Sequence, residues 1–104
     1  MNIYLISQDV NDGLDTYDSA IVVAKNITDA ATIHPSEFVT HIKDNKWMGM
    51  FDEAAHKNPD NEYENDEVMS WLKVSEIHKV KVELIGKADK SQGRGVIISS
   101  YNTG

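Results

Sequence analysis

The sequence predicts a small α+β domain with two layers, in which a four-stranded, mainly antiparallel sheet carries short helices on one face. Three observations predict this class. Two short apolar runs stand near the N-terminus, an alternating run and a final apolar run stand near the C-terminus, and only short helical patterns lie between them. The chain has 104 residues, which suffices for a single modest core, so we expect one domain spanning 1–104.

The first two strands are predicted at 3–6 (IYLI) and 20–24 (AIVVA). Both runs are continuously apolar and rich in β-branched side chains, which suits strands that are buried on both faces. Full burial of one aliphatic side chain is worth roughly 1.5–3 kcal/mol. We therefore expect the two runs to pair in the centre of one sheet, joined by a long polar loop over 7–19.

The last two strands are predicted from a change of pattern near the C-terminus. Between 77 and 85, apolar and charged side chains alternate, which indicates a half-buried strand with one wet face. The segment 86–95 contains three glycines and is expected to be a turn that leads into a final strand over about 96–101, forming a hairpin. The buried side of the alternating strand is expected to carry Val80, Val82 and Leu84.

A short helix is predicted directly after the second apolar run. Asn26 can cap it, and Asp29 stands in the first turn, where the helix dipole favours a carboxylate. Pro35 disfavours helical geometry in the residue before it and prevents the helix from continuing. The stripe that faces the sheet is expected to consist of Ile27, Ala30 and Ala31.

The middle of the chain leaves one alternative open. The segment 36–51 fits either a helical turn or an alternating strand. Its bulky apolar side chains are expected in the core, with a partner-binding patch as the other interpretation; they are Trp47, Met48, Met50 and Phe51. The segment 54–67 is a polar loop that is expected to protrude. A second short helix, capped by residue 65 or 66, is expected to place Val68, Trp71 and Leu72 on one face.

The charge of the chain is acidic and unevenly distributed. A net charge of −7 argues against binding to a phosphate backbone, because nucleic-acid affinity comes largely from Lys and Arg. Acidic residues concentrate in 52–67, whereas 73–94 is locally basic. No apolar run approaches the ~20 residues of a membrane span and no signal segment is visible, so we expect a cytoplasmic protein without a membrane partner.

The sequence carries no recognisable catalytic or metal-binding motif. Cysteine is absent, which excludes disulfides, thiolate catalysis and cysteine-ligated metals. The four histidines do not form the HExxH spacing, and phosphate loops and nucleophile elbows are missing. An EF-hand register that begins at Asp9 fails, because Gly13 falls at its fifth position and Ala20 at its twelfth. We expect no enzyme, no metal site and no cofactor.

Several short stretches stand out at the two ends of the chain. They are Tyr4-Leu5-Ile6-Ser7-Gln8, Asp15-Thr16-Tyr17-Asp18-Ser19-Ala20, Ile33-His34-Pro35, Val80-Lys81-Val82-Glu83, Gly95-Val96-Ile97 and Ser100-Tyr101-Asn102-Thr103-Gly104. Together they resemble a family of small uncharacterised proteins of bacteria and bacteriophages. The resemblance covers about the first 35 and the last 25 residues, the segment 36–72 departs from it, and it implies no activity.

The first functional hypothesis is a non-enzymatic, acidic protein-interaction module. Its partner would be a protein with a basic surface, which electrostatic attraction would orient. The phage members of the resembling family suggest an inhibitor of a host nucleic-acid-binding or defence protein. The candidate partner-binding residues are Asp9, Asp12, Asp15 and Asp18 in the first loop, with Asp60, Glu62, Glu64 and Asp66 in the second.

The alternative hypothesis is a small-ligand or nucleotide-binding protein that uses the first acidic loop and the C-terminal end. Tyr17 or Tyr101 would stack on the ligand, and Arg94 or Asn102 would supply polar contacts. The sequence leaves the identity of the partner open, and it leaves a homo-oligomer open as well.

Overall fold

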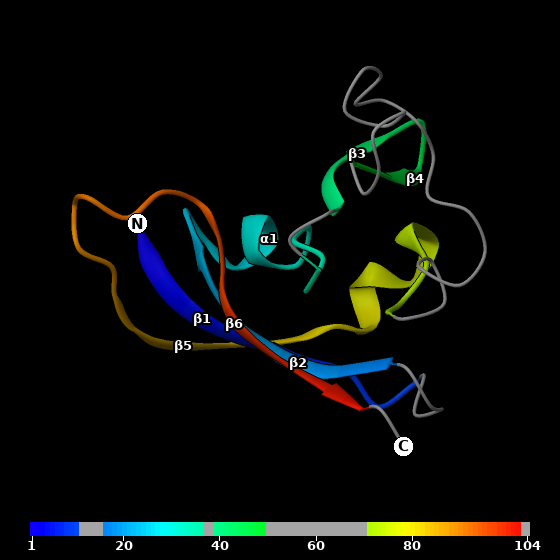
Figure 1. The fold of residues 1–104 in the computed structure, drawn as a ribbon, viewed down its shortest axis with the longest axis horizontal. Helices are drawn as coiled ribbons and strands as arrows, with labels where there is room; N and C mark the ends of the chain where they lie inside the picture. The colour runs from blue at the N-terminus through cyan, green and yellow to red at the C-terminus, as the bar shows by residue number, and fades with distance from the viewer. Residues whose placement is uncertain (11–15, 37–38, 50–70, 103–104) are drawn as a thin grey trace.

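The computed structural model describes residues 1–10, 16–36, 39–49 and 71–102. Its main feature is a four-stranded antiparallel sheet with the strand order β5-β1-β2-β6, which confirms the predicted sheet (Figure 1). A separate two-stranded hairpin is formed by β3 and β4. In chain order the elements are β1 (Asn2–Ser7), β2 (Thr16–Ala24), α1 (Ile27–Ala30), β3 (Val39–Lys43), β4 (Lys46–Gly49), the 3₁₀ helix η1 (Val74–Lys79), β5 (Lys81–Lys87) and β6 (Gly95–Asn102).

The two N-terminal apolar runs pair in the centre of the sheet, as predicted. On β2, Val22 and Val23 are buried on opposite faces, whereas only one face of β1 is fully buried. Tyr4 and Ile6 are 3% and 0% exposed, whereas Ile3 and Leu5 are half-buried. The prediction of burial on both faces was therefore wrong for β1. The reason is that the residues of the core cluster outside the sheet all pack on the side of Tyr4 and Ile6.

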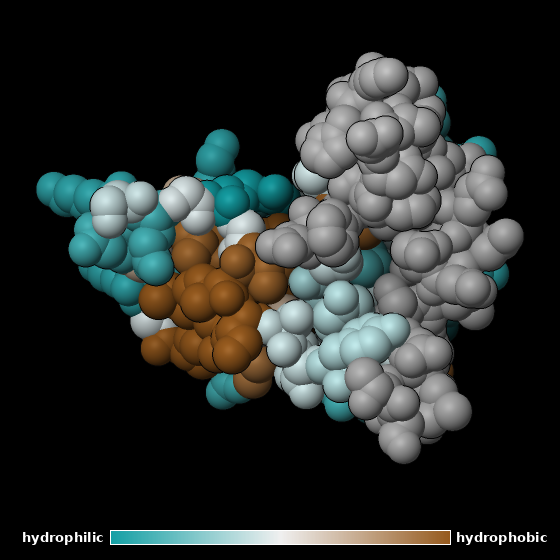
Figure 2. Space-filling model, in the orientation of Figure 1, coloured by the Kyte–Doolittle hydropathy of each residue, from teal (hydrophilic) through white to brown (hydrophobic). Residues whose placement is uncertain are grey.

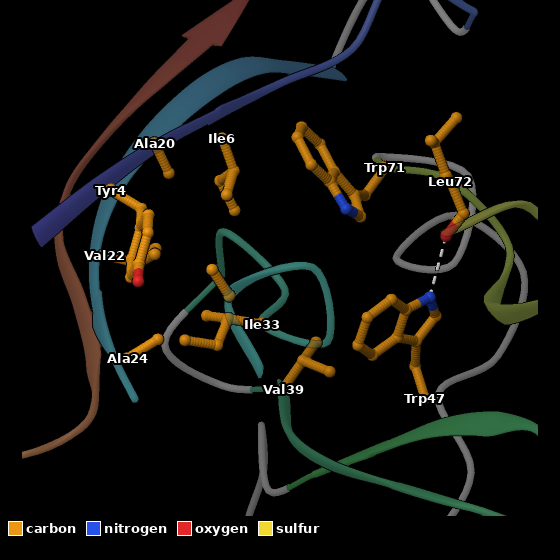
Figure 3. Close-up of a cluster of buried hydrophobic side chains, with 11 residues drawn as sticks. Tyr4, Ile6, Ala20, Val22, Ala24, Ile33, Val39, Trp47, Trp71 and Leu72 are labelled. Atoms are coloured by element: carbon orange, nitrogen blue, oxygen red, sulfur yellow. Dashed lines mark hydrogen bonds between the residues drawn. The ribbon is translucent and has the colours of Figure 1, made fainter. Parts of the chain in front are cut away.

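The core lies on that covered face (Figure 3). Side chains of β1 and β2 meet Ile33, Val39 and two tryptophans that come from the middle of the chain. The indole Nε1 of Trp47 donates a hydrogen bond of 2.8 Å to the carbonyl oxygen of Leu72, which joins the β3–β4 hairpin to the segment before η1. The hairpin and this segment are therefore fixed to each other as well as to the sheet.

Helix α1 begins and ends close to the predicted positions. The side chain of Asn26 accepts a hydrogen bond of 2.8 Å from the backbone N–H of Asp29, which is the expected cap. Ala30 is fully buried, but Ile27 is 59% exposed, so the predicted apolar stripe is wrong at Ile27. A helix of a single turn presents only a narrow face to the sheet, and Ala30 occupies it.

In the segment 36–51, the described residues 39–49 form a hairpin, so of the two open interpretations the strand holds there. Asp44 and Asn45 have φ angles of 53° and 61°, which is the left-handed geometry of a two-residue type I′ turn. Asp and Asn tolerate this conformation better than most residues. Trp47 and Met48 are buried, as predicted, while Met50 and Phe51 lie outside the described residues.

The C-terminal half differs from the predictions at three points. Residues 77–79 belong to η1, so the strand predicted from 77 begins only at 81. Leu84 was expected to be buried but is 58% exposed, because β5 is an edge strand and the single turn of α1 leaves this part of it uncovered. Trp71 and Leu72 are buried without being helical, and the predicted helix start and Val68 lie outside the described residues.

Candidate functional site: a groove along the edge strand β6

Strand β6 forms one edge of the sheet, and it is chemically unlike the opposite edge. Within the described part of the chain no strand pairs with its outer side. Its sequence GVIISSYN contains no charged residue and no proline, whereas β5 carries Lys81, Glu83 and Lys87. Charged side chains on an edge strand hinder the addition of another strand. The β5 edge is therefore protected, and the β6 edge is open.

Large apolar side chains are exposed on β6. Ile97, Ile98 and Tyr101 are 47%, 61% and 43% exposed. In the view of Figure 2, hydrophobic surface gathers where the first half of β6 crosses the sheet. Ile97 is the extra residue of a β-bulge, because its two neighbours pair with adjacent residues of β2. An exposed apolar area of this kind is typical of an interaction surface.

Two adjoining hollows lie beside this strand, and we call them together the β6 groove. The first has a volume of about 320 Å³ and the second of about 240 Å³. They share Ser36 and Val96 as walls, so they lie next to each other along β6. The first hollow is also lined by Thr32, His34, His41, Trp47 and Arg94, and the second by Tyr17, Pro35, Ile97, Ile98 and Ser99.

Arg94 closes the first hollow at the start of β6. Its Nε donates to Oδ1 of Asp29 and its Nη2 donates to Oγ1 of Thr32, both at 2.9 Å. The second carboxylate oxygen of Asp29 accepts a hydrogen bond of 3.0 Å from the backbone N–H of Lys25. Arg94 therefore ties β6 to α1 and holds one wall of the groove in place.

The pKa of Asp29 should make this tie depend on pH. Partial burial by itself raises the pKa of Asp29. The hydrogen bonds from the Lys25 N–H and from Arg94, together with the charge of Arg94, outweigh burial, so the pKa of Asp29 lies below its ordinary value of about 3.9. A lowered pKa stabilises the fold above the pKa of the unfolded chain, and this stabilisation is lost as the pH falls through the folded-state value.

We therefore expect Asp29→Asn to lower the free energy of unfolding by about 1 kcal/mol at pH 7, a modest value because Arg94 is partly exposed. The difference from the unmodified protein should shrink towards zero at pH 3. Urea unfolding at both pH values measures it, with Asp18→Asn as the control for an exposed carboxylate. An equal difference at both pH values would contradict the assignment.

The floor of the groove is aromatic. The ring centroids of Tyr17 and Tyr101 are 4.7 Å apart, and the imidazole of His34 meets the ring of Tyr17 edge-on at 6.1 Å. His34 is 2% exposed and also meets Trp47 edge-on at 5.1 Å. Its Nδ1 accepts a hydrogen bond of 3.0 Å from the backbone N–H of Ser36. This chain of rings connects the groove directly to the core, because His34 and Trp47 line the first hollow and Trp47 belongs to the core cluster.

Of the acidic residues predicted to bind a partner, only Asp9 and Asp18 lie within the described residues. Oδ2 of Asp9 accepts a hydrogen bond of 2.9 Å from Nζ of Lys81 on the exposed surface, and this bond and the charge of Lys81 lower the pKa of Asp9. Asp18 is exposed and is the extra residue of a bulge in β2. The remaining candidates lie outside the described residues; they are Asp12, Asp15, Asp60, Glu62, Glu64 and Asp66.

The described residues are not acidic as a set. They contain nine Lys or Arg against seven Asp or Glu, although the whole chain has a net charge of −7. The acidic surplus therefore belongs to the rest of the chain. The described strands present an apolar edge and a surface of mixed charge.

Two of the residues named for the alternative ligand site line the groove. Arg94 lines the first hollow and Tyr17 the second, and the ring of Tyr101 contacts that of Tyr17 at a tilt of 57°. Asn102 ends β6, and its side chain is outside the described atoms. Sequence reasoning missed Ser36, Ile97 and Ile98, although an uncharged final strand after a lysine-rich stretch was a visible signal.

Among the residues that the structure describes, no three side chains of the kinds that bind metals come together. None of the helices in the described ranges has the length and apolar character to cross a membrane. Comparison of the chain with known protein families, curated proteins and solved structures finds no match.

Proposed function

We propose that this chain is a non-enzymatic protein-interaction module that binds an extended segment of its partner by strand addition at β6. The observation that carries the proposal is an open, uncharged edge strand with a groove beside it. In strand addition, backbone groups of the edge strand pair with the incoming segment, and flanking pockets receive every second side chain.

The form of the groove fits an extended peptide. Its two hollows, of about 320 and 240 Å³, lie next to each other along β6, so each can receive a side chain of the same added segment. The volumes alone do not distinguish a peptide from a small molecule, because small-molecule sites commonly have about 300–1,000 Å³. Side chains on the other face of an added strand would lie beside Ile98, which pairs with Ile21 on the half-buried outer face of the sheet.

The acidic residues have a separate part in this proposal. Asp18, with the acidic residues outside the described ranges, would attract a partner with a basic surface and raise the association rate more than the affinity, whereas the charge of Asp9 is already paired with that of Lys81. The family resemblance suggests a biological setting, the inhibition of a host nucleic-acid-binding or defence protein. Binding would thus combine steering by acidic segments with recognition at β6.

The test is capture of partners from a bacterial lysate by three tagged proteins: the unmodified chain, Ile98→Lys and Leu84→Lys. The two substituted residues lie on opposite edges and have similar exposed fractions, 61% and 58%. We expect Ile98→Lys to lose the captured proteins, because a charge on the open edge hinders strand addition, and Leu84→Lys to retain them. Retention by both variants, or equal loss by both, would contradict recognition at β6.

A second candidate function is the binding of a small ligand. It is favoured by the position of Arg94 and Tyr17 along one groove, with the ring of Tyr101 in contact with Tyr17. A thermal-shift screen against nucleotides separates the two functions. A nucleotide-binding protein gains stability with its nucleotide by mass action, whereas a module that binds only protein segments gains none from nucleotides.

A further inference from the structure

We infer that a second copy of this chain occupies the β6 edge, so that two four-stranded sheets join into one continuous sheet with two-fold symmetry. The inference rests on the proposed strand addition at β6 and names the partner for it. The neutrality of β6, the register of its exposed side chains and the protection of the other edge each support a second copy.

The first support is electrostatic. In a two-fold antiparallel pair, residues of β6 lie opposite residues of the same strand in the second copy. Because β6 carries no charged residue, no like charges face each other across this pair in any register. The same arrangement at β5 would set Glu83 opposite Glu83, or Lys81 opposite Lys87 when centred on Leu84.

The second support is the spacing of the exposed side chains. A pairing centred on Ser99 sets Ile97 opposite Tyr101 of the second copy, and the symmetry makes this contact twice. Pairs of an aromatic and a β-branched side chain are favourable across antiparallel strands. Ile97 and Tyr101 are about half exposed in the single chain, so their apolar surface is available for this contact.

The third support is closure. After two β6 edges have paired, the outer edges of the joined four-stranded sheets are those of β5, which carry charged side chains. Charges on an edge hinder further strand addition. Association should therefore stop at a dimer and not continue into a fibre.

The expected strength follows from the length of the edge. A strand of eight residues is about 26 Å long. A contact limited to one edge lies at the small end of specific interfaces, near 1,000 Å² in total. We therefore expect a dimer that dissociates in the micromolar range, with monomer and dimer both measurable.

Sedimentation velocity over a range from low micromolar to millimolar protein tests the inference. The variants are Ile97→Lys and its match Ile85→Lys, because both residues are bulge residues on edge strands and are 47% and 49% exposed. We expect the unmodified chain and Ile85→Lys to dimerise with rising concentration, and Ile97→Lys to dimerise at least tenfold more weakly. Circular dichroism checks that both variants are folded.

A cross-link tests the register directly. The chain has no cysteine, so Ser99→Cys introduces a single thiol. Pairing centred on residue 99 sets the two thiols opposite each other, and mild oxidation should give a disulfide-linked dimer. Ser91→Cys, in the exposed turn before β6, should not cross-link at the same rate.

The outcomes separate this inference from the proposed function. Self-pairing at β6 is overturned if the unmodified chain stays monomeric at all concentrations. It is also overturned if both lysine substitutions weaken dimerisation equally. If the chain is monomeric and Ile98→Lys still abolishes partner capture, then the second copy is the wrong occupant and strand addition itself stands. If the chain dimerises through β6 and captures no other protein, self-association is its whole binding activity.

Discussion

Replacing Trp47 by alanine is expected to lower the free energy of unfolding by about 3–5 kcal/mol. The indole is 2% exposed, belongs to the hydrophobic core cluster and packs edge-on against His34. Its Nε1 also donates to the carbonyl oxygen of Leu72, 25 residues away in the sequence. Loss of the ring would remove packing between the hairpin and the sheet and the bond that joins the hairpin to the segment before η1.

Two further substitutions separate these contributions. Trp47→Phe keeps an aromatic ring but leaves the Leu72 carbonyl without its donor, so we expect a loss of about 1–3 kcal/mol. Ile27→Ala removes a side chain that is 59% exposed and should change stability little. Urea unfolding followed by circular dichroism measures all three. An alanine variant within 1 kcal/mol of the unmodified protein would mean that Trp47 does not anchor the hairpin.

The local features of the fold were predictable from local sequence. The Asn26 cap and the end of α1 before Pro35 depend on hydrogen bonds and backbone geometry within a few residues. The two apolar runs pair because no other segments near them are as apolar. For the hairpin at 39–49, a strand was only one of two predicted alternatives. The residues Asp44-Asn45, which are typical of a type I′ turn, would have favoured the hairpin.

The extent of β2 and the exposure of single side chains depend on distant contacts. Thr16 to Ser19 were assigned to a polar loop, yet they continue β2 because β6 pairs with them as far as Asn102. Similarly, Leu84 keeps the expected alternation but is exposed, since nothing among the described residues covers that corner of the sheet. Periodicity gives the faces of a strand and not the amount of cover over each face.

The candidate site was the least predictable part. The β6 groove brings together residues near 17, 32–36 and 94–99, which are far apart in the sequence. Their meeting depends on the strand order, which makes β6 an edge and places it beside β2. Composition directed attention to acidic loops, while the described residues present an uncharged edge that only the topology identifies.

Substitutions of neighbouring residues in β1 are expected to differ strongly in their effect on stability. Ile6 is 0% exposed and lies between Ala20 and Val82 on the covered face, so Ile6→Ala should lower the free energy of unfolding by about 2–5 kcal/mol. Leu5 is half-buried on the outer face, opposite Ile21, so Leu5→Ala should lower it by only about 1 kcal/mol.

The comparison of these two variants by urea unfolding tests which faces of the sheet are covered. Both residues are in the same central strand, and both substitutions remove a branched aliphatic side chain. Strand pairing therefore changes alike. The β-branched Ile6 also loses more β propensity than Leu5, but the whole propensity scale spans only about 1 kcal/mol, so a larger difference reports the packing over each face. Equal losses at Ile6 and Leu5 would mean that the outer face is also covered in solution. Since pairing at β6 joins sheets edge to edge, it would leave that face open in each copy, and the large difference should persist in the dimer.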